Sequence, residues 1–243
     1  MSKPFGKAFM RAASRYGQVR ALLRTASVSL PEASEKVLQE TVANLELFAS
    51  YPPLKEIFAP GSRAFEAIGG LPEAVKIMAG NQISFYLNAV TTAALVFAHS
   101  ILDAAVTDFC RLIAEASPES WDQALDVKTI KFEQIRSASV EAIRLQLLGS
   151  FLDKLERAAL PSRIEKLLAV CKPSSATLSS EGYTFDLDHI RRVDDQRHRL
   201  MHGEASAPTM QEVEAEVTYL EATTYRLMSC LFEPFDIYPD MTL

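Results

Sequence analysis

The sequence predicts an all-α protein, an up-and-down helical bundle with a helical appendage at its N-terminus. Two long segments, residues 83–116 and 137–159, place apolar side chains at helical spacing, and the first contains neither Gly nor Pro. No segment alternates apolar and polar residues over enough positions to require a sheet. Because long helices with short connections pack as antiparallel neighbours, we expect residues 81–243 to form the bundle and residues 1–80 the appendage.

The predicted appendage is a series of short helices separated by Pro and Gly. A basic amphipathic helix opens it, and Pro31 introduces a second helix over residues 35–48. Shorter helical pieces are expected over residues 63–68 and 72–78. A role of these helices in recognising a partner protein is one possible function of the chain.

The predicted bundle begins with residues 83–116, which would form a helix about 50 Å long. Residues 121–130 are expected to form a connecting turn before the second long helix at 137–159. Pro161 then starts a shorter helical piece, and a Ser-rich loop covers residues 174–182. Pro208 opens the last helix, which ends before Pro234.

Composition limits the classes of function. The chain has 243 residues, of which 48% are hydrophobic, so it can bury a substantial core. Its net charge of −6 excludes an overall basic field, and any contact with nucleic acid must be local. The three cysteines are far apart in apolar segments, which predicts reduced core residues of a cytoplasmic protein. The longest apolar run is too short to span a bilayer, so we expect no membrane association.

The segment from residue 186 to residue 203 carries most of the candidate chemistry, with three of the four histidines. Asp186 can cap a helix over residues 187–202, and Gly203 stands where a helix often ends with positive φ. Apolar residues and Arg197 share one face of this helix. A guanidinium on a buried face must meet a carboxylate, a carbonyl or an anion.

The run Arg197-His198-Arg199-Leu200-Met201-His202-Gly203 resembles the Arg-x4-His motif of the HEPN superfamily. The resemblance implies a helical bundle that dimerises so that two motifs face each other, and a metal-independent endoribonuclease without a cofactor. Its catalytic residues would be Arg197, His202 and His198. RNA would be the substrate, Arg199 would help to bind it, and a role in defence or with an antitoxin or other inhibitor protein would be expected.

The resemblance also implies a carboxylate on the first long helix that holds the motif arginine. Asp103 and Asp108 are the candidates, and Asp103 has the more apolar neighbours, where a carboxylate most needs a cation. The other interpretation is that both lie on a polar edge of the helix and contact only water.

Metal-free RNA cleavage fits these residue types. Histidine titrates near about pH 6.5 and can act as base or acid, and arginine matches the phosphate oxyanion. Five helical steps place Arg197 and His202 about 140° apart, so they cannot face one phosphate from a straight helix. Either the helix distorts near Gly203, or two chains assemble the site between them.

Two alternatives to the ribonuclease remain open from the sequence. His198 and His202 have the i, i+4 spacing of helical zinc ligands, but Arg199 replaces the glutamate of the zinc-peptidase pattern and would repel a cation. The motif could instead be structural, with Arg197 joining helices through Asp103. The chain would then be a non-catalytic helical binding or regulatory module.

Overall fold

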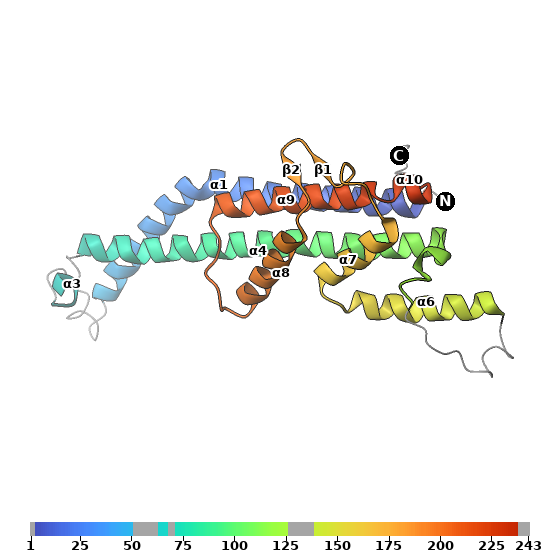
Figure 1. Ribbon diagram of the computed structural model, residues 1–243. Helices are drawn as coiled ribbons and strands as arrows, with labels where there is room; N and C mark the ends of the chain where they lie inside the picture. The colour runs from blue at the N-terminus through green and yellow to red at the C-terminus, as the bar shows by residue number, and fades with distance from the viewer. Residues whose placement is uncertain (1–2, 51–62, 68–70, 126–138, 238–243) are drawn as a thin grey trace. The chain divides into compact units, whose positions relative to one another are not determined.

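The computed structural model describes residues 3–50, 63–67, 71–125 and 139–237, which form an all-α helical bundle, as the sequence predicts (Figure 1). The chain divides into two compact units. Unit 1 contains Met1–Val19, Leu95–Ser206 and Glu214–Leu243, and unit 2 contains Arg20–Ala94 and Ala207–Val213. The division into an appendage and a bundle at residue 80 stays a prediction.

Two long helices contribute to both units: α1 spans Lys3–Ser50 and α4 spans Leu71–Ala116. The sequence predicts a helix start at Pro31, but α1 continues through it. Pro31 has no N–H for the carbonyl of Ser27, and both residues are exposed, so water can satisfy that carbonyl. The short α3, Arg63–Ala67, lies between these helices in the chain, and the predicted end of its segment falls outside the described residues.

α4 is apolar over most of its length. Its segment Glu73–Ala116 is long and apolar enough to cross a membrane by composition, and 50% of its most apolar window is buried within the protein. Core helices of water-soluble bundles have the same composition, because a helix surrounded by others is apolar on several faces.

After α4, a 3-10 helix, η1, spans Pro118–Trp121 and ends where the predicted turn of residues 121–130 begins; residues 126–138 fall outside the described chain. The second predicted long helix is α6, Val140–Glu156. Ser139 caps it, because the Ser139 side chain accepts a hydrogen bond from the Ala142 amide at 3.1 Å. The fully buried Trp121 contacts the ring of Phe151 at 5.7 Å between centroids and so attaches α6 to η1.

Residues 157–159 alone separate α6 from α7, Leu160–Cys171, which Pro161 opens as predicted. A small hairpin follows, in which β1 at Ser179–Ser180, inside the predicted loop of residues 174–182, pairs with β2 at Tyr183–Thr184, directly after that loop. Gly182 turns the chain at φ +75°, a conformation that glycine adopts without strain.

α8 spans Leu187–Met201, α9 spans Met210–Ser229 and α10 spans Phe232–Phe235. The part of α8 nearest its start is attached to α9, because His189 Nε2 lies 2.7 Å from Glu216 Oε2. Figure 1 shows α7 and α8 as short helices set obliquely to the long α4.

The core of unit 1 is formed by apolar side chains from α4, α7, α8 and α9, including Leu102, Val106, Phe109, Ile113, Ile164, Leu167, Ile190, Val193, Leu220 and Leu227. The three cysteines are free and buried, as predicted. α1 joins this core through Tyr16, whose hydroxyl lies 2.9 Å from Thr224 Oγ1 on α9 and donates to the Ala98 carbonyl of α4 at 3.4 Å.

Candidate functional site

α8 begins and ends where its sequence predicts. The Asp186 side chain accepts a hydrogen bond from the Asp188 amide at 2.8 Å. At the other end, Gly203 has φ +70°, and the Glu204 amide donates to the Arg199 carbonyl at 2.8 Å. This αL termination holds the end of the helix in a defined place. Ile190 and Val193 are buried, whereas Met201, predicted on the same face, is 61% exposed.

Arg197 is partly buried, with 32% of its side chain exposed. Its Nη2 lies 3.3 Å from Asp194 Oδ1, one turn earlier in α8. The same Asp194 oxygen lies 3.0 Å from His99 Nε2 on α4. Asp194 is therefore the carboxylate that holds Arg197, and it places the motif helix against α4.

Asp103 has a different partner from the one predicted. Its carboxylate forms an ion pair with Arg163 on α7, and Arg163 Nη1 also donates to Thr107 Oγ1 at 2.7 Å. Arg163 is only 5% exposed. Asp108 forms a separate ion pair with Arg11, at 3.8 Å. Asp103 therefore supports the neighbouring helix, one turn of α4 away from His99.

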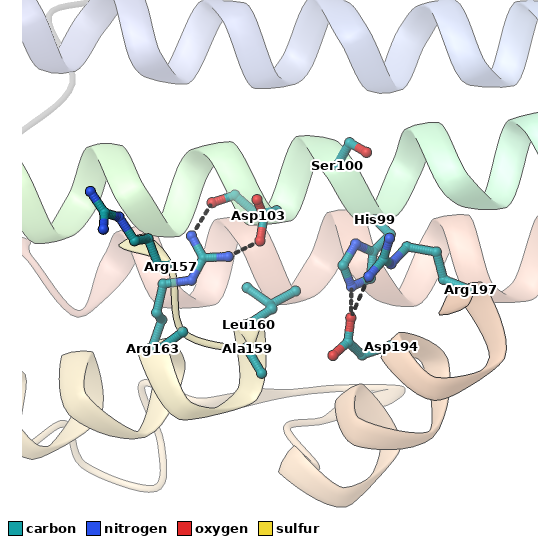
Figure 2. Close-up of a pocket in the computed structure, with 10 residues that line it drawn as sticks. His99, Ser100, Asp103, Arg157, Ala159, Leu160, Arg163, Asp194 and Arg197 are labelled. Carbon is teal, nitrogen blue, oxygen red and sulfur yellow. Dashed lines mark hydrogen bonds and ion pairs between the residues drawn. The ribbon is translucent and has the colours of Figure 1, made fainter. Parts of the chain in front are cut away.

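These groups surround a pocket of about 320 Å³ in unit 1, shown in Figure 2. α4 supplies His99 and Asp103, the start of α7 supplies Arg163, and α8 supplies Asp194 and Arg197. The turn between α6 and α7 adds residues 157–159, including Arg157. Three arginines and a histidine thus face this pocket, and its two carboxylates neutralise only part of the positive charge of the arginines.

His99 is the most buried titratable group of the pocket, at 4% exposed. Burial, together with the positive charges of Arg197 and Arg163, lowers the pKa of His99 from 6.5 to about 4, against the opposing effect of Asp194. The imidazole is neutral at pH 7. It can accept or share a proton with Asp194 but adds no positive charge.

His198 and His202 lie outside the pocket. Both are exposed, and their rings contact each other with centroids 4.5 Å apart. His202 is the residue at which α8 ends. Arg199 is also exposed, and its Nη2 donates to the Glu204 carbonyl at 3.5 Å. One chain therefore brings the two imidazoles together but places Arg197 in a different, more buried environment.

The described residues contain no group of three or more His, Cys, Asp or Glu side chains that could hold a metal ion. The two exposed histidines have no acidic third ligand in that part of the chain.

His99, Arg157, Arg163 and Asp194 are pocket residues that motif reasoning missed. One pattern in the sequence points to His99, because His99 and Asp103 lie four residues apart on an otherwise apolar helix face. Arg163 is likewise a cation inside an apolar first turn, next to Pro161 and Ile164. Polar residues at such positions require partners on neighbouring helices.

Comparison of the chain with protein-family models, with curated proteins and with solved structures found no match.

Proposed function

We propose that this protein is a metal-independent endoribonuclease of the HEPN type, acting on single-stranded RNA. The observation that carries the proposal is the arrangement on α8. A partly buried arginine is fixed by Asp194 at a basic pocket, and the imidazole pair of His198 and His202 stands on the adjoining turn. Arginine and histidine together supply oxyanion stabilisation and proton transfer without a metal.

In the proposed reaction one imidazole, at His202 or His198, takes the proton of the ribose 2′-hydroxyl. The 2′-oxygen attacks the adjacent phosphorus, and the bond from phosphorus to the 5′-oxygen breaks. The second imidazole, in its protonated form, gives a proton to that leaving oxygen. Arg197, with Arg199 at the surface, binds the phosphoryl oxygens as negative charge grows on them. The products are a 2′,3′-cyclic phosphate and a 5′-hydroxyl end.

The proposed site is shared between two chains. Arg197 faces the pocket whereas His202 is exposed at the helix end, so one straight α8 does not present both to the same phosphate. A two-fold axis next to the end of α8 would place the imidazoles of one protomer beside Arg197 of its partner. Because activity then requires the dimer, a protein that covers this end of α8 would act as an inhibitor.

The test is cleavage of single-stranded RNA in EDTA, followed by analysis of the new ends. We expect cyclic-phosphate ends, and no cleavage of an oligonucleotide that carries 2′-deoxyribose throughout. His202→Ala should abolish cutting while the circular dichroism spectrum stays unchanged, because His202 is exposed. Cutting that persists in both His202→Ala and Arg197→Ala would remove these residues from the mechanism.

A second candidate is a non-catalytic helical binding module. It is favoured by the contact of His99 with Asp194 and by the pairing of Arg163 with Asp103, because these contacts connect α4, α7 and α8 without any substrate. In that case Arg197→Ala should lower stability and His202→Ala should have no effect on any measured property. A monomer at micromolar concentration would also favour this candidate over the shared site.

A further inference from the structure

The first turn of α7 opens onto the pocket without a side-chain cap. Ala159 is the N-cap residue, and alanine has no oxygen that could accept from the first amides of the helix. Ala158, Ala159 and Leu160 line the pocket. The N-terminal end of a helix carries a partial positive charge and free N–H donors, and such ends bind phosphate and other anions.

The charged side chains of the pocket leave an excess of positive charge. Arg163 is paired with Asp103 and Arg197 with Asp194, whereas Arg157 is exposed and makes no ion pair within the described part of the chain. Because His99 is neutral at pH 7, the three arginines and two carboxylates sum to one positive charge. An anion would neutralise both this charge and the helix end.

Unpartnered buried donors are a second and independent observation. Four buried side-chain nitrogen atoms lack a hydrogen-bond partner among the described residues, and three of them belong to residues lining this pocket: Arg163 Nε, Arg197 Nε and His99 Nε2, the last of which lies 3.0 Å from the Asp194 carboxylate. His99 and Arg163 are both more than nine-tenths buried. Buried polar atoms are nearly always hydrogen-bonded, so two guanidinium Nε donors without an acceptor beside the pocket favour a ligand rich in acceptors there.

We infer that this pocket binds a phosphate group, held by the guanidinium of Arg157 and the uncapped amide of Leu160 at the start of α7, with Arg163 and Arg197 completing the basic wall. A volume of about 320 Å³ is at the small end of ligand sites, so it admits a phosphate with little more than the attached sugar. Inorganic phosphate, a mononucleotide and a 5′-phosphorylated RNA end share this chemistry. The inference does not depend on RNA cleavage, because it concerns binding at residues outside the His198 and His202 pair.

The test is isothermal titration of the full chain with inorganic phosphate, with 5′-AMP and with adenosine. We expect phosphate and AMP to bind and adenosine not to bind. Arg157→Gln should weaken phosphate binding about tenfold, the effect of one charge-assisted contact. Lys154→Gln is the matched control, because it removes the same charge from an exposed residue of α6 that does not line the pocket.

Ala159→Asp separates binding from folding. The new carboxylate would cap α7 and occupy the anion position, so the melting temperature should stay equal or rise while phosphate binding is lost. RNA of the same sequence with and without a 5′-phosphate distinguishes an RNA end from a free small molecule as the ligand. Equal phosphate affinity in the original chain, Arg157→Gln and Ala159→Asp would overturn the inference, as would adenosine binding as tightly as AMP. Loss of RNA cleavage with phosphate binding intact would count against the nuclease alone.

Discussion

The buried His99 makes the stability of unit 1 depend on pH in a direction fixed by its pKa. The pKa of His99 is about 4 in the folded protein, against 6.5 as the ordinary value, because burial and the nearby Arg197 and Arg163 disfavour its charged form. As pH falls through 6.5, His99 becomes protonated in the unfolded chain but stays neutral in the folded chain. Acid therefore favours unfolding until about pH 4, where both states carry the proton.

The magnitude follows from the two pKa values. One pKa unit corresponds to about 1.4 kcal/mol, so the shift corresponds to about 3 kcal/mol over the whole range. Between about pH 7.5 and pH 5 the loss should be about 2 kcal/mol of unfolding free energy. His99→Gln provides the comparison, because glutamine does not titrate and its amide can still donate to Asp194.

The assay is urea denaturation of the original chain and of His99→Gln at the two pH values. We expect the original chain to lose about 2 kcal/mol more than the variant on acidification, since all other titrating groups are common to both. If the difference in unfolding free energy between the original chain and His99→Gln is the same at both pH values, the reasoning is refuted. If the original chain instead becomes more stable relative to His99→Gln at low pH, the attraction of Asp194 outweighs the effect of burial on the pKa of His99, and His99 is charged in the folded state.

Three other predictions concern contacts and helix ends within the described part of the chain. Arg163→Met should lower the unfolding free energy by about 1–3 kcal/mol. This is less than the loss expected on breaking a fully buried ion pair, because the Asp103 side chain is 41% exposed and water can solvate it. If the double variant with Asp103→Asn loses the sum of the two single losses in unfolding free energy, the pair is not coupled. Gly203→Ala should lower the unfolding free energy by about 1 kcal/mol, because Gly203 has a positive φ that alanine adopts only with strain. Gly149→Ala within α6 should raise the unfolding free energy, because an added Cβ there meets open space. A higher melting temperature in both variants would contradict the αL termination of α8. Tyr16→Phe should cost about 1 kcal/mol by removing a buried hydroxyl that is bonded to α9, and an unchanged denaturation midpoint would contradict that contact.

Local chemistry explains why the bounds of α8 are predictable from sequence. The cap at Asp186 and the positive φ at Gly203 each depend on residues within one turn, so the predicted range of 187–202 matches Leu187–Met201 closely. Pro31 shows the limit of the same reasoning. A proline usually ends a helix, but on an exposed face its cost is small enough for the continuous packing of α1 to outweigh it.

The assignment of ion pairs was not predictable in the same way. Asp103 and Asp194 are both carboxylates near the pocket, and Arg163 and Arg197 are both candidates to meet them. The pair of Arg163 with Asp103 depends on where α7 contacts α4, and that is decided by the packing of apolar faces rather than by any local pattern. The pair of Arg197 with Asp194 is different, because these residues are three positions apart on α8 and helical spacing alone brings them together.

The position of Arg197 affects how its substitution must be interpreted. Arg197→Ala would remove the proposed contact to a phosphate, leave Asp194 beside His99 without its cation, and so raise the pKa of His99 toward its ordinary value. A loss of RNA cleavage in that variant could therefore arise from altered charge in the pocket as well as from lost oxyanion stabilisation. His202 is exposed, does not line the pocket and contacts only the ring of His198 among the aromatic pairs described. The response of His202→Ala thus separates chemistry at the end of α8 from electrostatics within the pocket.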